Sequence, residues 1–286
     1  CMSHASLSTD REPAEEALRM SDRDFQRVAR RVSDMAGIVL EPHKRQMIVS
    51  RLSRRLRALE MATISEYLDH LDAGRDPDEL QEFVNTLTTN LTSLFREDHH
   101  FRHLRDAVLE PYASGPRGRL RIWSAGCSSG EEPYSIGLCL LDVIGAIPPD
   151  ARILASDIDT KMLARARRGH YPAEKCATLD PRFRRFLKTV PPGGEGCMPS
   201  SLVQAVAFRR LNLLEPWPMQ GKFDAIFCRN VMIYFSQSTK AHLIDRFADL
   251  LLPNGYLYLG HSESLLGRHP RLESIGETIY RLRNGV

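Results

Sequence analysis

The segment WSAGCSSGEEPYS (123–135) contains residues whose types and spacing suit the binding of a ligand. Gly126 and Gly130 permit a tight turn and a close approach of the backbone to that ligand. Glu131 and Glu132 begin the next predicted helix, where they could also serve only to complement the helix dipole. The loop lacks the GxGxxG spacing, and two carboxylates would repel the pyrophosphate of a dinucleotide. The pattern therefore favours a cofactor with an ammonium and a sulfonium over NAD.

A second acidic position, Asp157, follows the next predicted strand. An acidic residue at this strand end of an open α/β sheet commonly binds the hydroxyls of a ribose. Asp157 or Asp159 could instead cap the following helix, and Thr160 could also fill that role. Taken together with the acidic loop, Asp157 favours a nucleoside methyl donor over a nicotinamide.

Alternating strands and helices must position these residues from about residue 118 onwards. This alternation predicts a parallel, doubly wound sheet, whose ligands bind beyond the carboxyl ends of the strands. RLESIGETIYRLR near the C-terminus adds two short strands, which we expect to form an antiparallel edge. The four predicted strands of the parallel part are LRIWSAG (120–126), RILASDID (152–159), FDAIFC (223–228) and YLYLG (256–260).

The residues before the sheet are predicted to be helical. Ser21 and Asp24 form a capping-box pattern, and Gly37 suits the end of that helix. A second helix is expected at 43–60, and Asp76 followed by proline starts a third. The expected divisions are a disordered leader (1–20), a helical domain (21–90), a linker helix (91–117), an α/β domain (118–286) and an inserted β-subdomain (172–206).

Composition excludes several classes of protein. The chain has 286 residues, 42% of them hydrophobic, and a net charge of only +3, which gives it no overall polyanion-binding character. Its six cysteines are scattered, which favours a reduced protein over a disulfide framework. We find neither a signal peptide nor an apolar run long enough to span a bilayer. We therefore expect a cytoplasmic protein without membrane insertion.

Six motifs, in order along the chain, resemble those of the CheR-type chemotaxis receptor methyltransferases of bacteria. The resemblance runs from about residue 22 to 282 and implies a Rossmann-like methyltransferase sheet with an N-terminal helical domain and a small inserted antiparallel β-subdomain. It also implies S-adenosylmethionine as cofactor, glutamate side chains of receptors as substrate and S-adenosylhomocysteine as product. The motifs are LTTNLTSLFRE (87–97), GEEPYS (130–135), ASDIDT (155–160), NLLE (212–215), FDAIFCRNVMIYF (223–235) and GHSE (260–263).

The resemblance implies a role for each matched residue. Glu131 is expected at the methionyl end of the cofactor, Asp157 at the ribose, and Asn212 with Leu213 beside the adenine. Tyr234 is expected close to the transferred methyl group. Further cofactor contacts are implied for Asn90, Thr92 and Arg96, and for Arg229 and Asn230 beneath the cofactor. Gly126 is expected to contact the cofactor through the close backbone approach that glycine permits.

Four of these residues also have a purely structural interpretation. Asn90 and Thr92 could cap the helix that ends before them. Arg96 could form a surface ion pair with Glu97 or Asp98, and Tyr234 could be a core aromatic at a strand end. In the functional interpretation, Arg96 and Tyr234 orient the substrate carboxylate. That carboxylate is already ionised at neutral pH and needs no general base.

A basic helix at 43–60 suggests how the receptor is recognised. Lys44, Arg51, Arg54 and Arg55 are expected to share one face, which could dock on the acidic methylation helices of a receptor or could merely be solvated. The resemblance also suggests that the β-subdomain binds a receptor's C-terminal tail peptide as an added strand.

Several other signals are discounted. His99 and His103 are one helical turn apart, but they are expected on an exposed helix without a third ligand, so no metal is predicted. Cys127 and Cys228 lack a histidine partner and are interpreted as structural. Three rival functions are methylation of a nucleic acid or small molecule, a degenerate non-catalytic scaffold, and an NAD-linked oxidoreductase. No proline follows Asn230 in the segment where base methyltransferases carry a proline-proline-aromatic motif, so no nucleic-acid partner is predicted.

Overall fold

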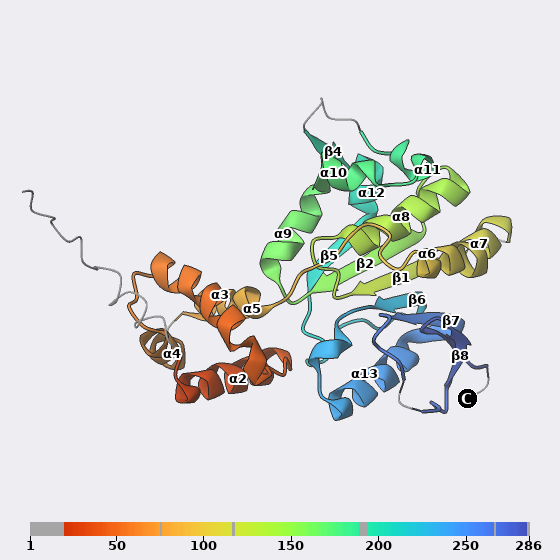
Figure 1. The fold of residues 1–286 in the computed structure, drawn as a ribbon. Coiled ribbons are helices and arrows are strands. Elements are labelled where there is room, and N and C mark those ends of the chain that lie inside the picture. Colours follow the sequence, from red (N-terminus) through yellow and green to blue (C-terminus); the bar gives the residue numbers. More distant parts are fainter. Residues whose placement is uncertain (1–19, 75, 116–117, 189–193, 266, 285–286) are drawn as a thin grey trace, which may run out of the picture. The chain divides into compact units, whose positions relative to one another are not determined.

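The computed structural model describes residues 20–284 except 75, 116–117, 189–193 and 266. All but the last residue of the predicted leader therefore lies outside the described residues. The chain divides into two compact units, one ending at Thr88 and the other beginning at Thr89, shown in Figure 1. Among the described residues, no helix combines the length and the apolar character that crossing a bilayer requires.

In the described part of the first unit, every element is a helix or helical turn, as predicted. The Ser21 hydroxyl accepts the Asp24 N–H at 3.0 Å, and Gly37 ends the same helix with φ 68°. Asp76 caps a later helix, with proline at its first position. The short helix at 64–72 was not predicted. The elements are α2 (Asp22–Ala36), a 3-10 turn η1 (Pro42–Lys44), α3 (Arg45–Ala58), α4 (Ile64–Asp72) and α5 (Pro77–Leu87).

Two arginines of the predicted basic face bind inside the first unit. Arg55 pairs with Glu79, whose side chain is 2% exposed and also accepts the Tyr67 hydroxyl at 2.7 Å. Arg51 donates to the carbonyls of Leu87 at 3.0 Å and Thr88 at 2.7 Å, and so satisfies the C-terminal end of α5. Both half-exposed arginines therefore have internal partners, which the sequence could not reveal because those partners lie far away along the chain.

The second unit contains the predicted sheet. Its seven strands follow the order β5-β2-β1-β6-β7-β9-β8, and the first five pair in parallel. The last two form the expected antiparallel edge. The fold class is thus confirmed, while edge strand β5 was not predicted. The strands are β1 (Leu120–Ala125), β2 (Ala151–Asp157), β5 (Val206–Arg210), β6 (Phe223–Cys228), β7 (Leu251–Leu259), β8 (Leu272–Gly276) and β9 (Ile279–Leu282).

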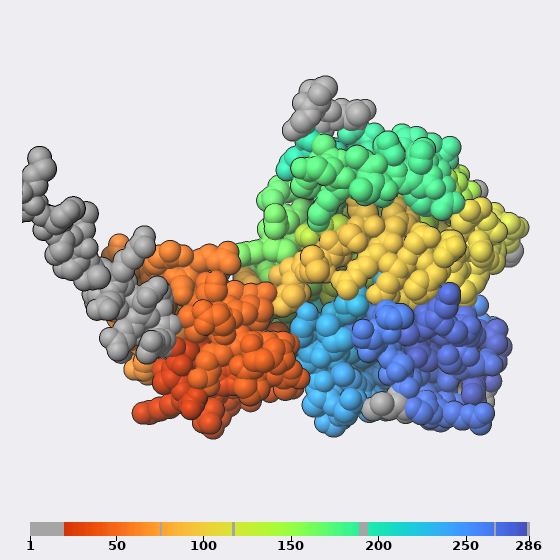
Figure 2. Space-filling model, in the orientation of Figure 1, coloured from red at the N-terminus to blue at the C-terminus, as the bar shows by residue number. Residues whose placement is uncertain are grey.

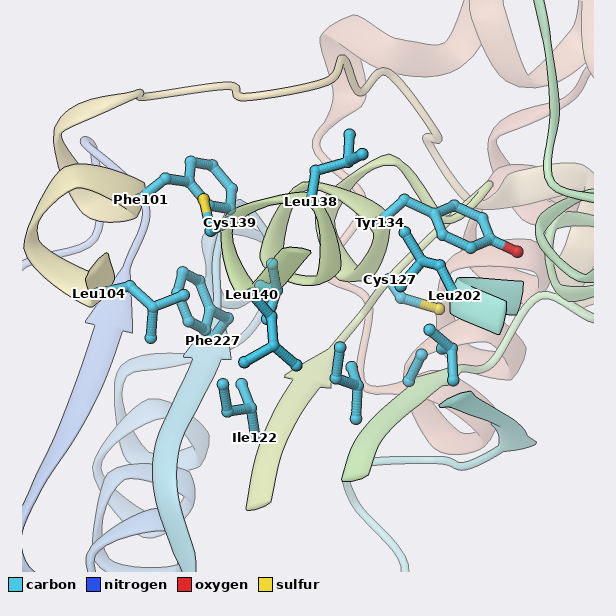
Figure 3. Close-up of a cluster of buried hydrophobic side chains, with 14 of the residues drawn as sticks. Phe101, Leu104, Ile122, Cys127, Tyr134, Leu138, Cys139, Leu140, Leu202 and Phe227 are labelled. Atoms are coloured by element: carbon cyan, nitrogen blue, oxygen red, sulfur yellow. The ribbon is translucent and has the colours of Figure 1, made fainter. Parts of the chain in front are cut away.

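Helices cover both faces of this sheet (Figure 1). On one face, Leu138 and Leu140 of α8 (Glu131–Ile144) pack with Phe227, in the cluster drawn in Figure 3. On the other face, Phe247 of α13 (Gln237–Leu250) packs on Trp123 at a ring-centroid distance of 5.4 Å. A further helix, α9 (Thr160–Arg168), follows β2 and ends at Gly169 with φ 63°.

The segment expected to be an exposed linker helix packs on the sheet. It forms α6 (His99–Leu104), a π turn (Arg105–Leu109) and α7 (Glu110–Ser114). Phe101 stacks on Phe227 at 5.8 Å, and His103 Nδ1 lies 2.9 Å from the Tyr258 hydroxyl. His100 is fully buried. The expected exposure of these histidines is wrong, because Phe101 and Leu104 form an apolar stripe that draws the helix onto the sheet.

The inserted subdomain contains a two-stranded antiparallel sheet, β3 (His170–Pro172) with β4 (Glu195–Cys197). It lies on the surface of the second unit, where Figure 2 shows it in green and teal. A cavity of about 470 Å³ is lined by Arg184, Arg185, Lys188 and Glu195 together with apolar side chains. Three short helices, α10 (Ala173–Ala177), α11 (Pro181–Arg184) and α12 (Ser200–Ala205), complete the subdomain.

Candidate functional site

The glycine loop joins β1 to α8 at the carboxyl end of the sheet. Gly126 has φ 86° and Gly130 has φ 94°, backbone conformations that favour glycine. A Cβ on Gly126 would lie 2.2 Å from Val231 Cγ2, and one on Gly130 would lie 2.8 Å from Ala166 Cβ. Both glycines are therefore required by the packing of the protein itself, beyond any approach of a ligand.

Both glutamates of the loop are paired with cations. Glu131 is fully buried and binds Lys175 Nζ at 2.7 Å and the Ser129 hydroxyl at 2.6 Å. Glu132 accepts the Ser124 hydroxyl at 2.7 Å and lies 3.2 Å from Arg229. The two carboxylates that were expected to repel a pyrophosphate are therefore each compensated by a cation. The compensating cations come from segments far along the chain, which local spacing does not reveal.

Asp157 ends β2 and holds the glycine loop in place. Its carboxylate accepts the backbone N–H of Ser128 at 2.7 Å and that of Asp159 at 2.8 Å. Burial raises its pKa to about 6. Asp159 caps the N-terminus of α9, because its carboxylate accepts the N–H groups of Lys161 at 2.9 Å and Met162 at 3.1 Å. Asp157 is consequently not the helix cap that the sequence left open.

Asn90 joins the same cluster from the segment that precedes α6. Its Nδ2 donates to Asp159 Oδ2 at 2.8 Å, and Ser128 Oγ approaches its backbone carbonyl at 3.4 Å. Thr92 is half-buried two residues further on. The C-cap of α5 is Thr88, so Asn90 and Thr92 lie beyond that helix end and do not cap it.

Arg96 and Arg229 are linked through backbone. The Arg96 guanidinium donates to the Leu91 carbonyl at 2.9 Å, and Arg229 in turn donates to the Arg96 carbonyl. The acidic neighbours of Arg96 pair elsewhere, Glu97 with Arg229 at 3.4 Å and Asp98 with Arg102 at 3.2 Å. The Arg229 side chain is 3% exposed and lies over the Phe101 ring at 5.4 Å. Arg229 thus ties Arg96 to α8 and to the core.

The turn after β6 is held by Glu263, a residue for which the sequence predicts no separate role. Glu263 is 5% exposed, and its carboxylate accepts the N–H groups of Asn230 at 2.7 Å, Ile233 at 3.0 Å and Gly260 at 2.8 Å. Asn230 has φ 58°, and half-buried Tyr234 ends a 3-10 turn, η3 (Met232–Tyr234). Tyr234 is therefore no core aromatic of a strand. The GHSE motif was the available signal for Glu263.

Asn212 and Leu213 follow the unpredicted strand β5. Both are buried, with 6% and 7% exposed. The Asn212 amide accepts the Leu214 N–H at 3.1 Å and donates to Glu215 at 3.2 Å. In the sheet register Asp157 lies opposite Arg210, two residues before Asn212. The predicted site residues from Gly126 to Tyr234 therefore follow the carboxyl ends of β1, β2, β5 and β6, while Asn90 and Arg96 join them from the segment before α6.

Neither a metal nor a cysteine nucleophile fits this arrangement. Among the described residues, Glu97, His99 and His100 form the group whose ligand atoms lie close enough for a metal ion. Arg229, 3.4 Å from the Glu97 carboxylate, competes with a cation there, and His100 Nε2 already lies 2.9 Å from the Glu277 carbonyl. The pKa values of Cys127 and Cys228 are raised by burial, which opposes thiolate formation.

Comparisons with known proteins cover both units. Residues 23–88 match the CheR methyltransferase all-alpha domain, and residues 90–281 match the CheR methyltransferase SAM binding domain. Chemotaxis protein methyltransferase 2 of Pseudomonas aeruginosa is 47% identical over 264 residues, covering 90% of this chain and 92% of the relative. The chemotaxis protein methyltransferases of Escherichia coli and Salmonella typhimurium are each 44% identical, covering 93% of this chain and 93% and 92% of the relatives. This chain belongs to the CheR methyltransferase family.

Proposed function

We propose that this protein transfers the methyl group of S-adenosylmethionine to glutamate side chains of chemotaxis receptors. The main support for this proposal is that the two CheR domain matches span residues 23–88 and 90–281. The relatives covered over 92% and 93% of their own length are named chemotaxis protein methyltransferases. The products are a glutamate methyl ester and S-adenosylhomocysteine. Through this reaction the protein would tune chemotactic adaptation.

The donor groups at the carboxyl end of the sheet fit such a cofactor. We assign the ribose hydroxyls to Asp157, whose carboxylate has lone pairs beyond those used by the two backbone N–H groups. The cofactor's ammonium would share the Glu131 carboxylate with Lys175, and its adenine would lie beside Asn212 and Leu213. The remaining contacts are assigned to Asn90, Thr92, Arg96, Gly126, Arg229 and Asn230.

The reaction requires positioning more than proton transfer. The bound cofactor supplies a methyl group on a positively charged sulfur, which a carboxylate oxygen can attack directly. A glutamate carboxylate with a pKa of about 4.3 is ionised at neutral pH, so the protein needs no general base. The oxygen–methyl bond forms as the sulfur–methyl bond breaks, and both opposite charges disappear. Arg96 and Tyr234 would hold the carboxylate in line and remove its water.

The exposed basic residues of the first unit are proposed to dock the receptor. Arg54 and Arg57 are exposed on α3, and Lys44 is half-exposed in the turn before it. Because Arg51 and Arg55 bind Leu87, Thr88 and Glu79, they would support this surface without contacting the receptor themselves. Acidic methylation helices complement such a surface.

The β-subdomain is proposed to bind a receptor's C-terminal tail peptide. Its cavity of about 470 Å³ is lined by three basic residues, Arg184, Arg185 and Lys188, against one acidic residue, Glu195, so an acidic peptide would be favoured. Calorimetric titration with a receptor tail peptide would test this binding. We further propose a cytoplasmic location, since the five described cysteines are all free thiols, as expected in a reducing compartment.

Incubation with S-adenosylmethionine labelled in its methyl group tests the proposed reaction. With receptor-bearing membranes as substrate, we expect label on the receptor that mild base releases as methanol, which identifies a carboxyl methyl ester. Receptors whose methylated glutamates are replaced by alanine serve as the control and should stay unlabelled. Label on nucleic acid, or base-stable label on the receptor, would contradict the proposal.

A further inference from the structure

The loop proposed to lie beside the adenine is held by one arginine from a distant helix. Arg246 of α13 donates to the Leu213 carbonyl at 2.7 Å and to the Glu215 carbonyl at 2.7 Å. Its guanidinium lies over the Trp217 ring at 3.8 Å. Trp217 adds a third donor, because its indole N–H binds the Leu213 carbonyl at 3.1 Å.

This support rests on the core of the second unit. Trp217 contacts Trp123 at 4.9 Å and Phe247 at 5.0 Å between ring centroids. Trp123 and Phe247 are both fully buried, so the ring that carries the guanidinium has a rigid base. A planar guanidinium that forms two hydrogen bonds while stacked has little freedom to reorient.

The hydrogen bonds fix the side chain of Asn212 indirectly. The peptide group between Leu213 and Leu214 is bonded at both ends, its carbonyl to Arg246 and its N–H to Asn212 Oδ1 at 3.1 Å. Asn212 Nδ2 donates to Glu215 at 3.2 Å, and the Glu215 carbonyl is the second acceptor of Arg246. Both ends of the Asn212 amide are thereby set by a loop that Arg246 orients.

We propose that Arg246, with Trp217, is a positioning residue that gives the cofactor site its preference for adenine. This inference rests on the proposed function, because it takes Asn212 and Leu213 to border the adenine. A correctly held amide and backbone can distinguish adenine from a base whose exocyclic amine is replaced by oxygen. An unheld loop would bind more weakly and would discriminate less.

The test compares two ligands by calorimetry, S-adenosylhomocysteine and its deaminated analogue S-inosylhomocysteine. We expect Arg246→Ala to weaken binding of S-adenosylhomocysteine about tenfold and to reduce the preference over the analogue, since two hydrogen bonds are lost. Arg246→Lys should recover part of the affinity. In turnover, the KM for S-adenosylmethionine should rise while kcat stays within about twofold of wild type.

A matched control contacts the same helix from the segment before β8. Arg271 binds Asp249 and Asp245 of α13 at 2.5 and 3.5 Å, away from the loop, so Arg271→Ala should leave both ligand affinities unchanged. Trp217→Phe is the substitute test if Arg246→Ala does not fold. It keeps an aromatic ring beneath the guanidinium but removes the indole N–H, and should weaken binding of S-adenosylhomocysteine about threefold.

The proposal would be overturned if Arg246→Ala bound S-adenosylhomocysteine within twofold of the wild-type affinity and kept the wild-type preference over S-inosylhomocysteine. An equal loss of affinity for both ligands in the folded variant would also overturn it. If the wild-type protein bound neither S-adenosylhomocysteine nor S-adenosylmethionine, the proposed function itself would be wrong, so the two failures are distinguishable.

Discussion

The carboxylate of Asp157 is buried, yet its proposed role as acceptor of ribose hydroxyls requires the ionised form. Burial raises its pKa to about 6, above the value of about 3.9 in an unfolded chain. The folded protein therefore binds this proton more tightly than the unfolded chain does. Ionised Asp157 therefore lowers the free energy of unfolding at neutral pH. This destabilisation becomes smaller as the pH falls through 6 towards 4.

We predict that cofactor affinity falls as the pH drops through about 6. Below that pH the unliganded protein holds a proton on Asp157, and binding must displace it, so affinity for S-adenosylhomocysteine at pH 5 should be about tenfold lower than at pH 7. Calorimetry across this range measures the effect. Asp157→Asn should bind weakly at every pH, without the step near pH 6. A step of equal size in that variant would assign the titration to another group.

The types and order of residues in the sequence were enough to locate most of the proposed site, but they did not reveal which side chains pair with each other. Glu131 and Glu132 were found as acids in a glycine loop, whereas Lys175 and Arg229 are separated from them by long stretches of chain. Likewise, Glu263 stood inside a recognised motif, but its three backbone donors come from two different segments. Only folding brings such partners together.

At the scale of elements, the turn between β6 and α13 is held by Glu263. Its two oxygens accept three N–H groups, and two of these donors flank the segment that leads to Tyr234. Asn230 has φ 58° within this turn. Because the turn lies outside regular secondary structure, these hydrogen bonds fix the backbone position from which the Tyr234 side chain extends.

Glu263→Gln should therefore impair both stability and catalysis. The amide NH₂ would face a backbone N–H, leaving at least one donor buried without a partner and lowering the free energy of unfolding by about 2 kcal/mol. The rate of methyl transfer should fall more than cofactor affinity, because Tyr234 is displaced. Chemical denaturation and single-turnover kinetics measure the two effects. Glu273→Gln, at an exposed ion pair with Arg281, is the control and should change neither.

Arg229 connects three elements, and its removal should be more damaging. Arg229→Ala would leave Glu132 and Glu97 without their cation and the Arg96 carbonyl without its donor, which should reduce the free energy of unfolding by about 3–5 kcal/mol. Arg229→Lys keeps the charge but not the fork, so we expect partial recovery of stability with slower methyl transfer. Denaturant titration and initial-rate assays distinguish the two. Equal rates in Arg229→Lys and wild type would contradict a role in placing Arg96.

The fold was predictable where local signals and periodicity agree. Ser21, Gly37 and Asp76 marked helix boundaries correctly, and four parallel strands were found as apolar runs. Strand β5, VAFRR, was missed because it lies at the sheet edge and has two exposed arginines. The expected exposure of the histidines in α6 failed because tertiary packing on β7 decided their burial.

For the whole molecule, the proposed docking on an acidic receptor surface must be explained for a chain that is largely neutral. The net charge is only +3, so selection must come from a local surface. Several arginines of the first unit are occupied by internal or surface ion pairs, including Arg27 and Arg31 with Asp72. Arg54 and Arg57 differ from these, since both are exposed on α3.

We predict that Arg54→Glu with Arg57→Glu raises the KM for receptor about tenfold or more and leaves affinity for S-adenosylhomocysteine unchanged. Exposed charges act on the encounter with the receptor, so the wild-type KM should also rise with salt, and the double variant should be less sensitive to it. Arg51→Glu with Arg55→Glu is the contrasting pair. It should lower the melting temperature instead, because Glu79 would lose its partner and the end of α5 its donors. If both pairs affected receptor KM equally at unchanged melting temperature, all four arginines would contact the receptor, and the internal role inferred for Arg51 and Arg55 would be wrong.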